Sequence, residues 1–260
     1  MHGFCRRQST NTAALEFCID KRAHFAFTAQ QSDPRMKELT FEERFAILVD
    51  VEYCQRKNNA LKRLIKNADL EQNKANLVEI NYSAGRKLDR ETINRLATCD
   101  FLNEAANVFI TGATGSGKKY LACAIGYEAC KKFYSTKFVR MPDLLINLQT
   151  AVENKNLPRV MKKYTQPVLL IIDEWLLLKP TAEEEKLFFE VIHRRASKAS
   201  TIFCSQYRPS EWYDRLGGTV SPLTDSILDR IIHNAYQLNI ESTDPEKDIS
   251  MREIYNRIKN

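Results

Sequence analysis

Two widely separated groups of residues in this chain could together bind and cleave a nucleoside triphosphate. Residues 112–118 read GATGSGK, in which three glycines allow positive φ and turn backbone N–H groups toward one centre. Lys118 is placed to reach the β and γ phosphates as a point charge. The second group is the acidic pair Asp173 and Glu174, which ends an apolar run. This combination indicates phosphate binding followed by attack of an activated water.

Lys119 departs from the P-loop pattern. The pattern places a Ser or Thr after the conserved lysine, and its hydroxyl binds Mg²⁺. Here that hydroxyl is missing and a second cation replaces it. The alternative is a glycine-rich turn that caps an ordinary helix, but a β-branched run before the turn and an apolar-periodic run after it favour a P-loop. The expected cofactors are ATP and Mg²⁺, with the nucleotide bound by Gly112, Ala113, Thr114, Gly115, Ser116, Gly117, Lys118 and Lys119.

The acidic pair follows the apolar sequence VLLII, which is typical of a buried strand. Asp173 would hold the metal, usually through water, and Glu174 would act as the general base. The alternative is a pair of surface acids at a strand end. A P-loop followed by such a pair is more specific than either motif alone.

Two further positions could take part in catalysis. Gln206, with Ser205, lies just past the next predicted strand and could contact the γ phosphate or the attacking water; otherwise these are turn residues. Arg230 lies on an otherwise apolar predicted helix and could reach the ATP of a neighbouring subunit. Its alternative role is a local ion pair with Asp229 or Asp225.

Strand and helix patterns alternate from residue 107 onward, which predicts an α/β fold with a parallel sheet covered on both faces. Ligands of such sheets bind at the carboxyl ends of the strands, so the P-loop, Asp173 and Ser205 should converge. The expected strands are 108–110, 137–140, 168–173, 201–205 and 236–240, and the expected helices are 117–133, 141–152, 157–164, 182–197 and 223–233.

The part of the chain before residue 100 is predicted to be helical or irregular. We expect residues 1–32 to be poorly ordered, with at most one short helix. Thr40 and Glu43 form a capping box that opens a helix, which Asn58 and Asn59 could interrupt. Two or three short helices should follow over residues 70–103. A basic patch on the first helix is either a solvated face or a surface for DNA phosphates, and consists of Arg56, Lys57, Lys62, Arg63 and Lys66.

The composition is that of a soluble globular protein. The 260 residues are 43% hydrophobic and 28% charged, and the net charge of +6 favours a polyanionic partner. Seven scattered cysteines without a CxxC pair argue against a disulfide framework or a zinc site and favour a reducing, cytoplasmic setting. The longest apolar run, residues 167–172, is too short to span a membrane, and residues 1–30 lack the apolar core of a signal peptide. We therefore expect no membrane partner.

Several stretches resemble the IstB family. They are TFEERFAILVD (40–50), LATCDFL (96–102), GATGSGKKYLACAIGYEAC (112–130), LLIIDEW (169–175), SQYRPSEWYD (205–214) and ILDRIIHNA (227–235). Members of this family are AAA+ ATP-binding helpers of an insertion-sequence transposase, related to the DnaC helicase loader and to DnaA. The resemblance covers roughly residues 33–240.

The resemblance implies a small helical N-terminal domain followed by an AAA+ ATPase core, which hydrolyses ATP to ADP and phosphate. Together with the sequence pattern, it divides the chain into four segments. These are a poorly ordered N-terminal segment at 1–32, a helical DNA-binding and assembly domain at 33–100, the ATPase domain at 101–241, and a polar tail at 242–260. It also implies ATP-dependent homo-oligomers on duplex DNA that engage a cognate transposase. By position, residues 112–118 would bind ATP, Asp173 and Glu174 would be the Walker B pair, Gln206 would lie near the sensor position, and Arg230 would act in trans.

Two departures from the family pattern define the alternatives. Lys119 stands where the family has Ser or Thr, and roughly the first 25 residues do not resemble the family's opening helix. One alternative is therefore an ATP-sensing DNA-binding module with impaired hydrolysis. Another is a DnaC-like helicase loader in DNA replication.

Overall fold

A computed structural model describes residues 21–82, 85–243 and 251. Residues 1–20 and most of the predicted tail at 242–260 lie outside the described residues, so the expectations for them stay predictions. The chain divides into two units between Lys62 and Arg63. In the described part of the chain, no helix combines the length and the apolar character needed to cross a bilayer.

The described part of the first unit, residues 21–62, is mainly helical. Its long helix begins with the predicted capping box, because Glu43 N donates to Thr40 Oγ1 at 3.3 Å and Thr40 N donates to Glu43 Oε2 at 2.8 Å. The predicted interruption at Asn58 and Asn59 is wrong. The Asn59 side chain accepts a hydrogen bond from Gln55 one turn earlier, at 3.0 Å, and does not compete for the helix backbone. The elements are α2 (Lys21–Ser32), η1 (Pro34–Lys37) and α3 (Phe41–Ala68), whose last residues belong to the second unit.

The second unit is built on a six-stranded sheet with the order β1-β6-β2-β5-β4-β3. The five strands from β6 to β3 in this order are parallel, as predicted. The edge strand β1 pairs antiparallel with β6. The sequence did not predict β1, because a strand of two residues has no readable periodicity. The strands are β1 (Arg86–Lys87), β2 (Asn107–Gly112), β3 (Thr136–Arg140), β4 (Leu169–Asp173), β5 (Ser200–Ser205) and β6 (Ala235–Ser242).

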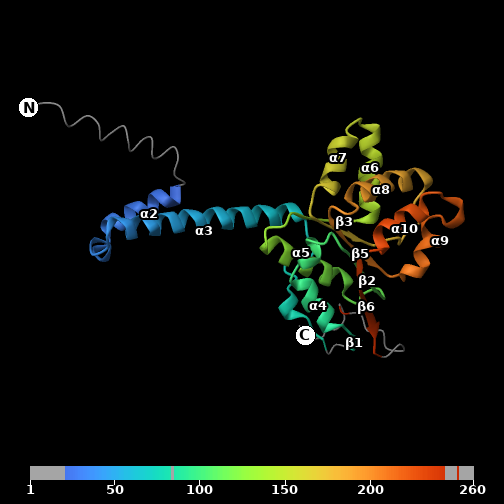
Figure 1. Ribbon diagram of the computed structural model, residues 1–260, viewed down its shortest axis with the longest axis horizontal. Helices are drawn as coiled ribbons and strands as arrows, with labels where there is room; N and C mark the ends of the chain where they lie inside the picture. Colours follow the sequence, from blue (N-terminus) through green and yellow to red (C-terminus); the bar gives the residue numbers. More distant parts are fainter. Residues whose placement is uncertain (1–20, 83–84, 244–250, 252–260) are drawn as a thin grey trace, which may run out of the picture. The chain divides into compact units, whose positions relative to one another are not determined.

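Helices cover both faces of this sheet (Figure 1). Helix α5 packs on β2, β3, β4 and β5 from one side, with α4 against it, while α6, α7, α8 and α10 form a connected layer on the other. The helices are α4 (Arg90–Ala97), α5 (Lys118–Lys131), α6 (Met141–Glu153), α7 (Leu157–Thr165), α8 (Ala182–Arg195), α9 (Trp212–Leu216) and α10 (Thr224–Ile232), with short turns η2 (Leu77–Glu79), η3 (Asp100–Leu102), η4 (Pro209–Glu211) and η5 (Gly218–Val220).

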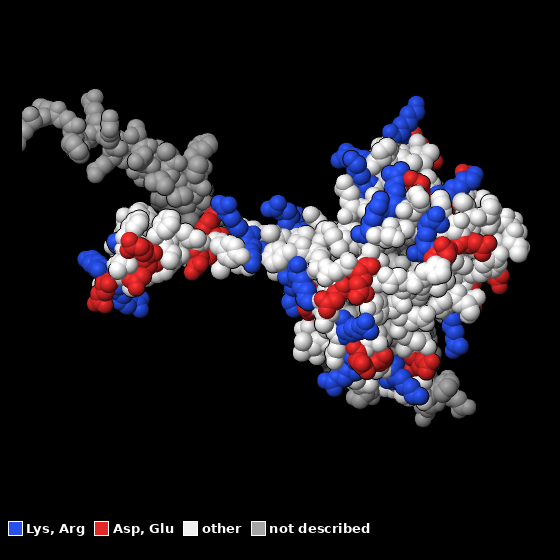
Figure 2. Space-filling view, in the orientation of Figure 1, with Lys and Arg blue, Asp and Glu red and all other residues white. Residues whose placement is uncertain are grey.

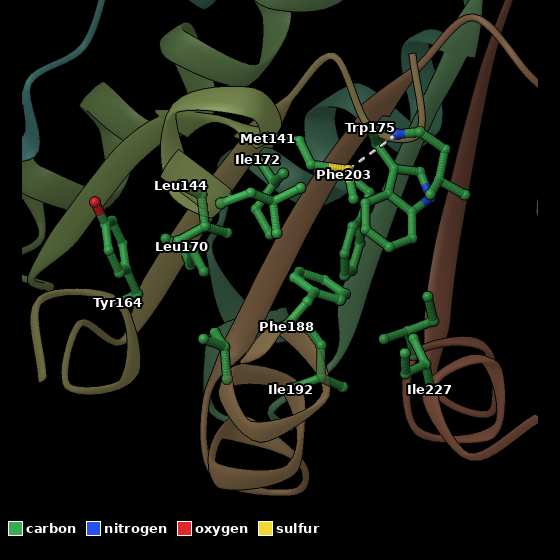
Figure 3. Close-up of a cluster of buried hydrophobic side chains, with 14 of the residues drawn as sticks. Met141, Leu144, Tyr164, Leu170, Ile172, Trp175, Phe188, Ile192, Phe203 and Ile227 are labelled. Atoms are coloured by element: carbon green, nitrogen blue, oxygen red, sulfur yellow. Dashed lines mark hydrogen bonds between the residues drawn. The ribbon is translucent and has the colours of Figure 1, made fainter. Parts of the chain in front are cut away.

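An aromatic cluster fixes the end of β4. Trp175 is fully buried, and its ring centroid lies 4.9 Å from that of Phe203 and 5.1 Å from that of Phe188 (Figure 3). On the opposite face of the same strand, Ile171 packs against α5, where a Cβ added at Gly126 would come within 2.7 Å of it. Because β4 is covered on both faces, the acidic residues that follow Ile172 have a fixed position at the edge of the sheet.

Candidate functional site

The loop between β2 and α5 has the backbone that the glycine pattern predicts. Gly112, Gly115 and Gly117 have φ of 150°, 82° and 100°. A Cβ at Gly112 would lie 2.7 Å from the carbonyl oxygen of Ile240, and one at Gly117 would collide with the guanidinium of Arg86. Gly112 and Gly117 therefore require glycine for their dihedral angles and also for space, and Gly115 requires it for its dihedral angle.

Lys118 lies inside this loop. Its Nζ donates hydrogen bonds to the carbonyl oxygens of Gly112 and Ala113, each at 2.7 Å. Burial lowers the pKa of Lys118. The ammonium group therefore lies at the loop, where the charged oxygens of an entering anion could replace these neutral carbonyl acceptors.

Lys119, one residue later, forms ion pairs with two acids from distant parts of the chain. Its Nζ lies 2.8 and 2.9 Å from the two carboxylate oxygens of Glu71, and 3.2 Å from Asp173 Oδ2. Burial opposes the charge of Lys119, but hydrogen bonding to Glu71 and the charge of Asp173 outweigh it and raise its pKa. Asp173 is only 4% exposed, and burial raises its pKa while the charge of Lys119 opposes that shift.

This arrangement does not fit the magnesium site that a P-loop usually carries. Mg²⁺ takes oxygen ligands, whereas an ammonium group offers three donors and no lone pair. Among the described residues, Asp173 Oδ2 accepts no hydrogen bond, and its charged partner is Lys119. The predicted metal ligand Asp173 is thus occupied by an ion pair with Lys119, and the residue after Lys118 supplies no hydroxyl.

Glu174 has a positive φ of 57°. Its Oε2 accepts a hydrogen bond from Arg140 Nη2 at 2.7 Å, and this bond is the main cause of a raised pKa for Arg140. Arg140 ends β3 and is paired in register with Asp173 on β4. Backbone bonding from Trp175 N to Cys204 O at 2.9 Å fixes the turn, so the carboxylate is held at the carboxyl edge of the sheet.

Gln206 contacts the glycine-rich loop directly. Thr114 Oγ1 donates to Gln206 Oε1 at 3.1 Å. Ser205, at the end of β5, is buried and donates from Oγ to the carbonyl oxygen of Trp175 at 2.9 Å, which links the ends of β5 and β4. The structure thus brings together the loop after β2, the acids after β4 and the amide after β5.

Arg230 lies on α10, apart from this group. Its Nη1 donates to the carbonyl oxygen of Ser226 at 2.6 Å, and its guanidinium carbon lies 5.3 Å from the centroid of the Phe189 ring. In the described part of the chain it forms no ion pair with an acid and no hydrogen bond with the loop. The alternative of a pair with Asp229 is wrong, since Asp229 pairs instead with His233 at 2.6 Å.

Sequence reasoning missed two residues that contact the loop. Glu71, after α3, reaches Lys119 from 48 residues away, and Arg86 of β1 donates from Nη1 to the carbonyl oxygen of Ser116. Neither residue belongs to a local motif. Only the tertiary fold places them, so no sequence signal could have identified them.

Basic side chains gather on two helices. On α3 all members of the predicted basic patch are exposed; Arg56 bonds to Glu52 at 2.6 Å, and the ammonium of Lys57 lies 4.7 Å from the centroid of the Tyr53 ring. A second group lies over α7 (Figure 2), which exposes Arg159, Lys162 and Lys163.

Comparison with known proteins identifies the family. The family described as IstB-like ATP binding protein matches residues 13–251. The chain belongs to this IstB-like family. This IstB-like chain is 35% identical over 181 residues to an ATP-binding protein named for insertion sequence IS1162 of Pseudomonas fluorescens, covering 70% of this chain and 78% of that protein. It is 32% identical over 215 residues to an insertion-sequence ATP-binding protein of Sinorhizobium fredii, covering 83% and 86%.

Solved structures agree with this IstB-like assignment at the level of the fold. AMPPCP-bound DnaA from Aquifex aeolicus aligns with a TM-score of 0.55 at 22% identity, over 72% of this chain and 55% of DnaA. DnaI aligns with a TM-score of 0.51 at 22% identity, over 64% and 87%. The fold is that of a P-loop AAA+ protein, as the sequence predicted. At these identities the likeness shows the fold alone.

Proposed function

We propose that this IstB-like chain binds ATP in the loop between β2 and α5 and uses the bound state to control its assembly on duplex DNA during insertion-sequence transposition. The observation that carries the proposal is the meeting of Lys118, the acids after β4 and Gln206 at the carboxyl edge of one parallel sheet. That edge is where ligands of such sheets bind. The insertion-sequence names of the relatives support a cognate transposase as partner.

We propose the following roles for these residues. The backbone N–H groups of residues 112–118 and the start of α5 hold the phosphates, and Lys118 exchanges its carbonyl contacts for phosphate oxygens. Glu174 is the general base, and Gln206 orients the γ phosphate or the attacking water. Arg230 completes the site of a neighbouring subunit, which makes the active form a homo-oligomer.

Two contacts support slow hydrolysis, which favours the ATP-sensing alternative over a fast ATPase. Lys119 pairs with Asp173, and Glu174 is hydrogen-bonded to Arg140. A general base held by a cation is not free to take a proton from water. ATP binding, and not rapid turnover, is then the signal that controls assembly.

DNA contact is proposed for the exposed basic patch on α3. Within the described residues, Lys62, Arg63 and Lys66 form no ion pair with an acid, so their charges are available to phosphates. We retain the division into a helical DNA-binding and assembly domain at 33–100 and an ATPase domain at 101–241. The cysteine usage and a DNA partner support the cytoplasm as the compartment.

The test compares DNA assembly with and without ATP for the wild type, Lys118→Ala and a matched control, Lys131→Ala. Lys131 lies on the same helix and pairs with Glu128 on the surface. ATP should increase the mass of the protein–DNA complex for the wild type and Lys131→Ala, measured by light scattering, and should have no effect on Lys118→Ala. ATP-independent assembly of the wild type would contradict the proposal.

A helicase loader remains the functional alternative, and it rests on fold likeness to DnaC and DnaI alone. Retention of a cognate transposase on an affinity column, with no retention of the replicative helicase, would support the transposition role. The reverse result would replace it with the loader.

A further inference from the structure

We propose that the ammonium group of Lys119 takes the place of the divalent cation in this P-loop, so that the chain binds free nucleoside triphosphate without Mg²⁺. The inference rests on the proposed function, because it concerns how the same site holds ATP. It begins from the misfit between the side chains at the site and a magnesium ion.

The position of the ammonium group is the first argument. Lys119 Nζ lies 3.2 Å from Asp173 Oδ2, at the residue whose carboxylate should otherwise face the metal. Lys119 is the second residue of α5, directly after Lys118, so it occupies the sequence position of the hydroxyl ligand of a P-loop. One side chain thus removes a metal ligand and supplies a positive charge at the same place.

Charge balance is the second argument. The carboxylate of Asp173 is buried, and Lys119 is the cation that pairs with it. A metal ion bound beside Asp173 would lie next to this ammonium group and would be repelled by it. A nucleotide without metal brings only negative charge, which is attracted to both Lys118 and Lys119.

Glu71 supplies the third argument, because it shows how Lys119 can change partners. Its carboxylate binds Lys119 through both oxygens, yet its side chain is 49% exposed, whereas that of Asp173 is 6% exposed. A solvated carboxylate gives up an ion pair at lower cost than a buried one. Entry of a triphosphate should therefore displace Glu71 from Lys119 and leave the pair with Asp173 intact.

The experiment measures the dissociation constant of AMPPCP by calorimetry, with Mg²⁺ and with excess EDTA, so that hydrolysis does not interfere. For the wild type the two constants should agree within about threefold. For Lys119→Thr, which restores a hydroxyl, Mg²⁺ should tighten binding by about tenfold or more. Lys119→Met keeps nearly the length of the side chain but removes its charge, so it should weaken AMPPCP binding in EDTA by about tenfold. This variant provides the test if Lys119→Thr is unstable.

Retained metal gives a second readout. After gel filtration with AMPPCP and Mn²⁺, little Mn²⁺ should remain with the wild type, and about one ion per bound nucleotide should remain with Lys119→Thr. The control Lys131→Thr, on the exposed side of the same helix, should behave as the wild type does.

The outcomes separate the inference from the function on which it rests. Wild-type binding that weakens more than about tenfold in EDTA would overturn the inference and leave the ATP-binding function standing. Absence of AMPPCP binding under both conditions would overturn the proposed function itself.

Discussion

Arg140 and Glu174 lie at the ends of adjacent strands and share a 2.7 Å hydrogen bond between Nη2 and Oε2. The bond joins the proposed general base to a cation that the same sheet edge supplies. Because a carboxylate bound this way is directed at the arginine, the pair should restrain catalysis.

Removing the arginine should therefore release the base. We expect Arg140→Ala to raise ATP turnover about threefold or more, measured by phosphate release, with little change in nucleotide affinity. In the same background, Glu174→Gln should remove the gain and lower turnover by about a hundredfold. An unchanged rate in Arg140→Ala would show that the hydrogen bond does not restrain Glu174.

Arg195 should contribute strongly to stability, although it lies far from the site chemistry. It is 1% exposed and donates to the carbonyl oxygens of Tyr164 at 2.9 Å and Pro167 at 2.8 Å, to that of Ser200, and to Thr201 Oγ1 at 3.0 Å. Lysine keeps the charge but cannot reproduce the planar set of donors. Arg195→Lys should lower the free energy of unfolding by about 2–4 kcal/mol, because buried acceptors lose their donors.

The neighbouring arginine provides the control for this measurement. Arg194 is half-exposed, and among the described residues its ion pair is with Glu190 on the surface, at 2.6 Å. In urea denaturation, Arg194→Lys should change stability by about 0.5 kcal/mol or less. Equal effects of the two substitutions would mean that the buried hydrogen bonds do not determine the loss in free energy of unfolding.

Salt dependence tests the basic patch on α3. If its side chains meet phosphates, log Kd for duplex DNA should rise with log salt concentration by about 0.9 per contact, and replacing Lys62, Arg63 and Lys66 by Ala should reduce that slope by up to about three contacts. A triple variant with the same charge change at Lys131, Lys186 and Arg194, which all pair with acids, is the control. An unaffected slope would mean that the patch is a solvated helix face, and α7 would then be the next surface to test.

Alkaline pH should destabilise the fold through Cys99. Burial raises the pKa of this thiol to about 11, from 9.0 in the unfolded chain, so the native state holds its proton where the unfolded state has lost it. Stability from this group is complete below pH 9 and is lost as pH rises toward 11, at about 1.4 kcal/mol per pH unit. Denaturant unfolding at pH 8 and pH 10.5 should show a smaller loss for Cys99→Ala than for the wild type; parallel losses would refute the assignment.

The sequence predicted the features that depend on local chemistry. Thr40 and Glu43 predicted the start of α3, and the alternation of apolar strands with helices predicted the parallel sheet. Both predictions were possible because capping and side-chain periodicity depend on residues that are close in the sequence. The glycines at 112, 115 and 117 likewise predicted the loop conformation, since only glycine adopts those φ values without strain.

The order of the strands in the sheet could not be predicted from the sequence. The rule that ligands bind at the carboxyl edge of a parallel sheet still indicated which motifs should meet. Pairings between distant side chains could not be predicted. Glu71 with Lys119, Arg86 with Ser116 and Arg140 with Glu174 join segments that carry no shared pattern. The sequence by itself determined that Lys119 replaces a hydroxyl ligand in a P-loop. Only the tertiary structure decided that its charge pairs with Asp173, because that contact depends on how α5 packs beside the end of β4.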